Sequence, residues 1–138
     1  MNYRLTLPVA MVLMACASDA AAPPEVSVEL LVETDKTILS EPFAYPYGTA
    51  RITAAIVTVP PGATIASHLH PVPLFAYILQ GRLIVDYGSP GTRTYLKGDA
   101  FVEAFEWSHR ARNGGRGNVK ILAVYAGAVG VPNSIPLE

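Results

Sequence analysis

The sequence predicts an all-β protein built as an antiparallel sandwich or barrel. Short runs rich in β-branched and aromatic residues alternate with turns rich in Gly and Pro along most of the chain. Strands of this length and spacing are typical of antiparallel sheets that fold over one core. No segment keeps the apolar period of an amphipathic helix. We therefore expect strands, rather than helices, to build the folded domain.

The strands can be placed in order from their composition and from the turns between them. Residues 26–33 alternate apolar and polar side chains over their first half, so they are read as the first strand, whereas residues 34–48 are irregular and rich in turn formers. The clearest run, residues 51–59, is dense in β-branched side chains. Further strands are expected at residues 64–70, 74–80, 82–87, 92–96, 100–104 and 119–125.

Length and charge allow one domain and argue against several classes of partner. The chain has 138 residues and a formal net charge of −1, and we assign residues 23–138 to one domain with a real core. No basic patch suggests a nucleic-acid partner. Beyond the N-terminal run, no apolar stretch is long enough to suggest a transmembrane helix.

The first 22 residues have the composition of an export signal followed by a short tether. Arg4 precedes a mostly apolar run, and small residues follow it. Residues 13–16 resemble the bacterial lipobox, in which the cysteine is lipidated, but residues 15–17 fit simple cleavage equally well. We expect a periplasmic or secreted protein whose only membrane contact would be a lipid on Cys16. Since Cys16 is the only cysteine, no intramolecular disulfide can form.

The three histidines of the chain are spaced so that they can surround one metal ion. His68 and His70 are two residues apart, so on a strand both imidazoles point to the same face. His109 is the third. Imidazole is a common ligand of transition metals, and its affinity alone does not select among them. The sequence therefore predicts a divalent transition metal, with Fe, Zn, Mn, Ni and Cu left open.

The histidines lie in two motifs that resemble those of the cupin family, over about residues 49–126. The first family motif reads G-x5-H-x-H-x3-E-x6-G, and this chain matches it at Gly62, His68, His70 and Gly81, with Leu74 at the position of the acid. The second reads G-x5-P-x-G-x2-H-x3-N, and the matches are Gly98, His109 and Asn113, with Ala104 and Glu106 at the other two positions. The resemblance implies a single cupin-type, jelly-roll-like antiparallel β-barrel.

The leucine at position 74 changes the metal site that the resemblance implies. In cupins with the full motif, the acid and three histidines bind the metal together, and leucine cannot ligate. The resemblance therefore implies a site of three neutral imidazoles, which would leave the double charge of the ion intact and some of its positions open to anionic or chelating ligands. Some cupin dioxygenases also use three histidines on iron, so oxygen chemistry is allowed.

Several other side chains are candidates for the site. Glu103 would become a ligand or a catalytic base if its strand turns it inward; otherwise it is a rim carboxylate. We expect a pocket near the metal to be lined by Leu74, Phe75, Tyr77, Phe105 and Trp107. Arg110 and Arg112 should point outward, opposite to His109, and Asn113 should make structural hydrogen bonds at a turn.

Two functions remain open at this point. The first is a metal-dependent enzyme, dioxygenase-like or isomerase-like, acting on a small anionic or chelating molecule. The second is a non-catalytic module that binds a small ligand or the metal itself. An enzyme needs open metal positions facing a cavity of substrate size, whereas a binding module can have its ion fully ligated. By analogy with cupins that pair through their sheets, we also expect a homodimer.

Overall fold

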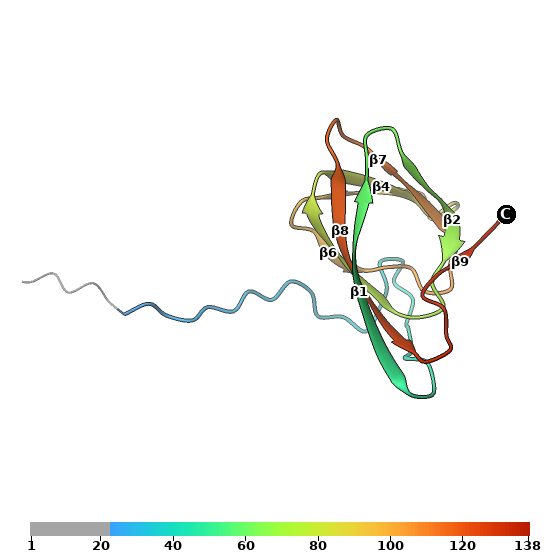
Figure 1. The fold of residues 1–138 in the computed structure, drawn as a ribbon, viewed down its shortest axis with the longest axis horizontal. Helices are drawn as coiled ribbons and strands as arrows, with labels where there is room; N and C mark the ends of the chain where they lie inside the picture. The colour runs from blue at the N-terminus through green and yellow to red at the C-terminus, as the bar shows by residue number, and fades with distance from the viewer. Residues whose placement is uncertain (1–22) are drawn as a thin grey trace, which may run out of the picture.

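The computed structural model describes residues 23–138, which form two antiparallel sheets facing each other (Figure 1). These residues contain no helix. Their strands are β1 (Ala50–Val59), β2 (Thr64–Leu69), β3 (Leu74–Gln80), β4 (Arg82–Asp86), β5 (Thr92–Leu96), β6 (Ala100–Val102), β7 (His109–Asn113), β8 (Val119–Ala128) and β9 (Ile135–Pro136).

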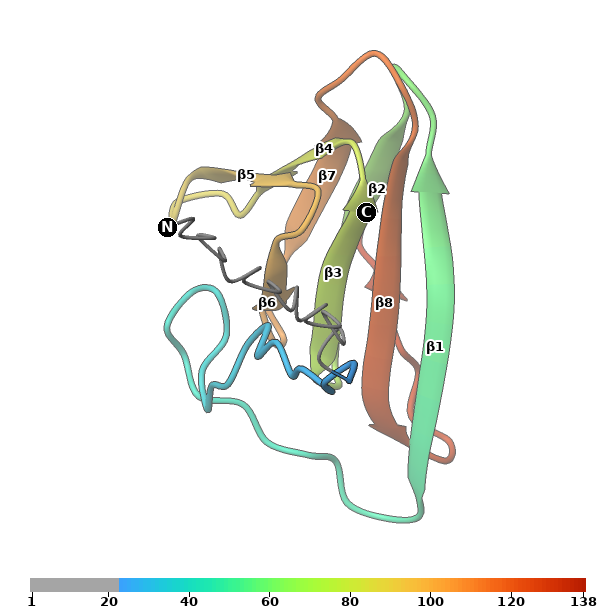
Figure 2. The same cartoon turned by 90° about the vertical axis from the view of Figure 1, so that its left-hand side faces the viewer.

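The strand order is that of a jelly-roll-like sandwich. One sheet has the order β1-β8-β3-β6 and the other β5-β4-β7-β2-β9, and every pairing between these strands is antiparallel. Figure 2 shows the two layers from the side, with β1, β8 and β3 side by side in one of them. The two sheets do not close into a continuous barrel, so the space between them is bounded by two separate layers.

The arrangement of β3 and β4 depends on the alternation of side chains along β3 and on a glycine in the turn between the two strands. On β3 the inward positions Leu74, Ala76 and Ile78 are buried, while the residues between them are only partly covered. The turn from β3 to β4 passes through Gly81, which has a φ of 85°. A Cβ atom there would lie 2.7 Å from the carbonyl oxygen of Asn118, so only glycine fits.

Most of the predicted strands form, with ends shifted by at most three residues. The prediction of a strand at residues 26–33 was wrong. This segment pairs with no strand of the described chain, and Val26 and Val28 are 96% and 91% exposed. Alternation indicates which faces a strand could present, but a strand also needs a partner edge, and this segment pairs with none of the edge strands β1, β6, β5 and β9. The two strands that we did not predict are β7 and the two-residue β9.

The predicted leader and tether, with Cys16, lie outside the described residues. Within residues 23–138, no helix has the length and apolar character that a membrane span requires.

Candidate metal centre

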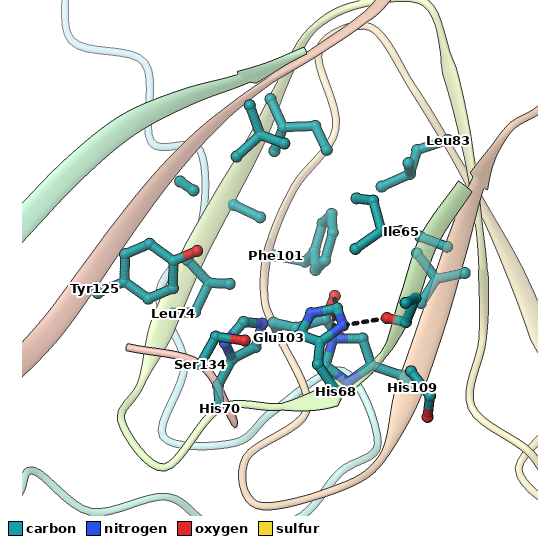
Figure 3. Close-up of a pocket in the computed structure, with 18 of the residues that line it drawn as sticks. Ile65, His68, His70, Leu74, Leu83, Phe101, Glu103, His109, Tyr125 and Ser134 are labelled. Atoms are coloured by element: carbon teal, nitrogen blue, oxygen red, sulfur yellow. Dashed lines mark hydrogen bonds and ion pairs between the residues drawn. The ribbon is translucent and has the colours of Figure 1, made fainter. Parts of the chain in front are cut away.

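The three histidines converge from two parts of the five-stranded sheet. His68 on β2 lies directly opposite His109 on β7 in the strand register, after an irregularity in β2. His70 follows the end of β2, where its backbone forms an isolated parallel β-bridge with Phe105. One ligand nitrogen from each ring lies within 4.8 Å of the other two. Figure 3 shows the three rings gathered at one end of a pocket.

Backbone carbonyls fix which ring nitrogen of each histidine faces the centre. The Nδ1 atoms of His68, His70 and His109 lie 2.8, 2.8 and 2.9 Å from the carbonyl oxygens of Ala66, Asn133 and Trp107, respectively. Because a carbonyl oxygen can only accept, each Nδ1 carries the proton and donates it. In the neutral rings, Nε2 is therefore left with a free lone pair. Such carbonyl partners are the usual means of orienting metal-binding histidines.

The surroundings also favour the neutral form of His68 and His70, the form that metal binding requires. The pKa of His70 is lowered to about 4, chiefly by burial and to a smaller extent by repulsion from the charged forms of His109 and His68. Burial likewise lowers the pKa of His68, with a smaller contribution from His109. Three lone pairs on neutral imidazoles are a donor set that suits a divalent transition metal. The residues therefore fit the metal that the sequence predicted.

Leu74 and Glu103 lie on the wall of the same pocket (Figure 3). Leu74 is buried and offers no ligand atom, so the position that carries an acid in the cupin motif supplies no ligand here. Glu103 is also buried, and its Oε2 lies 3.8 Å from Nε2 of His109. Its other oxygen, Oε1, accepts hydrogen bonds from the Tyr87 hydroxyl at 2.7 Å and from the Ala104 N–H at 2.8 Å. The inward orientation that we left open for Glu103 is the one that the structure has.

Sequence reasoning missed Tyr87, which holds Glu103 in place. Burial and the neighbouring Glu103 raise the pKa of Tyr87, so its hydroxyl stays protonated and donates. The Tyr87 hydroxyl also lies 2.9 Å from that of Tyr95. A signal for this residue was present in the sequence, because Tyr87 continues the inward parity of Leu83 and Val85 on β4.

The histidines open onto a cavity of about 330 Å³ between the two sheets. Of the five residues that we expected to line it, Leu74 does so and the four aromatic residues do not. Phe75 and Tyr77 have the opposite parity to Leu74 on β3 and point away from the cavity. Phe105 and Trp107 follow the end of β6 and do not line it; instead, Trp107 donates from Nε1 to the carbonyl oxygen of Tyr87 at 2.9 Å.

The residues around His109 behave as the strand alternation predicted. Arg110 and Arg112 are exposed, and Arg110 pairs with Asp86 at 2.8 Å on the outer face. Asn113 is buried and serves a structural purpose. Its Nδ2 donates to the carbonyl oxygens of Val59 and Gly117 at 2.8 and 2.7 Å, and its Oδ1 accepts from the Gly115 N–H at 2.7 Å.

The two-sheet fold and the histidine cluster agree with what a comparison with protein families finds. The family model described as "Cupin domain" matches residues 55–125, which is just over half of the chain and contains all three histidines. The chain belongs to the cupin family. A comparison of this cupin with curated proteins found no match.

Among solved structures, this cupin is similar to bacterial oxalate decarboxylases. The Lactobacillus farciminis enzyme, solved as a formate complex, is 27% identical, with a TM-score of 0.54 over 62% of this chain and 26% of that one. The Bacillus subtilis enzyme, which has Mn(II) centres, is 28% identical, with a TM-score of 0.51 over 62% of this chain and 24% of that one. The cupin thus spans about a quarter of the length of these enzymes.

Proposed function

We propose that this cupin is a metal-dependent enzyme acting on a small molecule that binds the metal through an anionic or chelating group. His68, His70 and His109 would hold the ion. The observation that carries the proposal is the orientation of the three rings, whose lone pairs are directed by backbone carbonyls toward one point on the wall of a cavity of about 330 Å³. A bound divalent ion would supply Lewis acidity or, with a redox-active metal, oxygen chemistry.

Glu103 is the residue of this chain best placed to move a proton. Its Oε1 is engaged by Tyr87 and by the Ala104 N–H, so its Oε2 is the oxygen directed toward His109 and the cavity. A buried carboxyl group held in this way can take a proton from a substrate at Oε2, and in an isomerisation it can return that proton elsewhere on the same molecule. Tyr87 would keep the carboxylate in this orientation throughout.

Two observations favour an enzyme over a module that only binds its ligand. The histidines face a cavity of substrate size rather than the packed core, and a carboxylate stands beside them. The oxalate decarboxylases with a similar fold support metal-dependent chemistry of this kind and make Mn a candidate beside Fe, Zn, Ni and Cu.

The proposal is tested by screening the metal-loaded protein for turnover. Protein loaded in turn with each metal would be offered small oxygen-containing acids and enols, including oxalate, while oxygen uptake, carbon dioxide release and isomerisation are followed. We expect Glu103→Gln to keep its metal and lose roughly 100-fold or more in kcat. The control is Glu106→Gln, an exposed carboxylate three residues away that does not line the cavity. Equal activity of the two variants would contradict the role of Glu103, and ligand binding without any turnover would favour the binding module.

We further propose that the protein is exported, by cleavage near Ala22 or by lipidation of Cys16. This rests on the N-terminal sequence alone. Intact-mass measurement of the protein from its native compartment tests it, and recovery of the uncleaved, unlipidated chain from the cytoplasm would contradict it.

A further inference from the structure

We propose that the substrate carries a single oxygen-bearing head group on an apolar body, and that this body lies in the cavity between the sheets. The inference rests on the proposed function and narrows it. It concerns the part of the substrate that does not touch the metal, and the three histidines do not determine the chemistry of that part.

The chemistry of the cavity wall is divided between its two ends. The four-stranded sheet side contributes Val57, Ile121 and Phe101, and the opposite sheet contributes Ile65, Leu83 and Val85. The polar groups gather around the histidines, where Glu103, Tyr125 and Ser134 lie. Figure 3 shows this arrangement, with Phe101, Ile65 and Leu83 on one side of the pocket and the histidine rings with Glu103 on the other. A molecule that fills this space must itself be polar at one end and apolar at the other.

The charges in the cavity argue against a small dianion such as oxalate. No lysine or arginine of the described chain lines this cavity. A divalent ion on the three imidazoles would be the only cation at the cavity, and the Glu103 carboxyl group lies beside it. A head group with one anionic group can stay at the ion, whereas any further negative charge would face apolar walls, which is costly. Oxalate also has no apolar part to cover those walls.

The apolar walls are themselves a source of affinity. Water in an apolar cavity has few hydrogen-bonding partners, so an alkyl or aryl group that takes its place gains the free energy of leaving water at little cost. Each buried methylene is worth about fourfold in affinity. This predicts that affinity rises with the length of the apolar body until the cavity is full.

The test uses a homologous series of ligands on protein with and without metal. Binding of acetate, butyrate, hexanoate and oxalate to Mn(II)-loaded protein would be measured by calorimetry, and binding of ethanol, butanol and hexanol to metal-free protein by thermal shift. We expect about fourfold tighter binding per added methylene in both series, and hexanoate to bind at least about 10-fold more tightly than oxalate.

Two alanines on β8 provide a matched pair of variants. Ala123 lines the cavity, whereas Ala126 lies on the other face of the strand and outside the cavity. Ala123→Leu should reduce the affinity for hexanoate about 10-fold or more and leave the affinity for acetate unchanged. Ala126→Leu should change neither affinity. If Ala123→Leu does not fold, Ala111→Leu, from the wall of the opposite sheet, makes the same test.

The outcomes separate this inference from the proposed function. Metal binding with no dependence on chain length, or oxalate binding more tightly than hexanoate, overturns the apolar-body inference alone. Failure to bind any metal, with alkanols still binding in order of length, overturns the proposed function and leaves the apolar pocket standing.

Discussion

The stability of the metal-free protein should fall steeply in mild acid, because the metal site holds a buried neutral histidine. His70 is only 3% exposed, and its pKa is lowered from 6.5 to about 4, chiefly by burial. The unfolded chain therefore binds more protons than the folded one between these two values. Stability is complete above pH 6.5 and is lost as the pH falls through this window.

The size of this effect follows from the two pKa values. For a histidine that titrates at about 4 when folded and 6.5 when unfolded, the loss between pH 7.5 and pH 5 is about 2 kcal/mol, and it approaches about 3 kcal/mol at lower pH. The lowered pKa of His68 acts in the same direction. The chain has three histidines and all lie in this site, so no distant histidine can produce the slope.

Urea denaturation between pH 5 and 7.5, with a chelator present, measures this directly. Staying above pH 5 keeps most carboxylates ionised, so that their titration contributes little. His70→Gln should show a much shallower dependence than the wild-type protein. A wild-type free energy of unfolding that stays constant within about 0.5 kcal/mol over this range, or an undiminished slope in the variant, would refute the reasoning.

Three further substitutions test other parts of the site and its support. Leu74→Glu puts a carboxylate beside the histidines, so the free energy of unfolding of the metal-free variant should fall by roughly 2–5 kcal/mol in urea denaturation. Added metal should stabilise the variant more than it stabilises the wild-type protein. An unchanged free energy of unfolding would mean that position 74 does not face the metal. Tyr87→Phe removes the hydrogen bond to Glu103 and should lower the free energy of unfolding by about 1.5–3 kcal/mol in urea denaturation. The control Tyr77→Phe, at a residue that does not line the cavity, should lower it little. Equal losses in the two variants would argue against the Tyr87 contact. Asn113→Ala removes three hydrogen bonds to the backbone and should cost roughly 2–4 kcal/mol by the same assay, and a loss below about 0.5 kcal/mol would contradict its structural role.

The ligand set was predictable because it depends on local spacing. Residues that are two apart on a strand point to the same face wherever the strand lies, so the shared orientation of His68 and His70 could be predicted from the sequence. The motif register then supplied His109. The strands could be predicted for the same reason, because the alternation of their side chains and the Gly and Pro turns between them are visible in the local sequence. Residues 26–33 show the limit of this reasoning, because whether a strand forms also depends on a partner edge that only the fold provides.

The pocket was harder to predict because it depends on which face of each strand is inward. Once Leu74 is placed toward the metal, Phe75 and Tyr77 must face the other way, so grouping all three in one pocket conflicted with the alternation of β3. The orientation of Glu103 could not be decided from sequence for a related reason. It follows the end of β6, and its position is fixed by bonds from Tyr87 and from its own neighbour's backbone, which come from the folded structure.

The number of metal ions bound per chain tests the central claim most directly. Equilibrium dialysis against each candidate metal, followed by elemental analysis, would compare the wild-type protein with His109→Ala and with Arg110→Ala, an exposed neighbour that points away from the site. The proposed site predicts one ion per chain in the wild type and in Arg110→Ala, and less than about a tenth of that in a folded His109→Ala protein, because two imidazoles hold a divalent ion far more weakly than three. One tightly bound ion retained by His109→Ala, or none in the wild type with any of the metals, would contradict it.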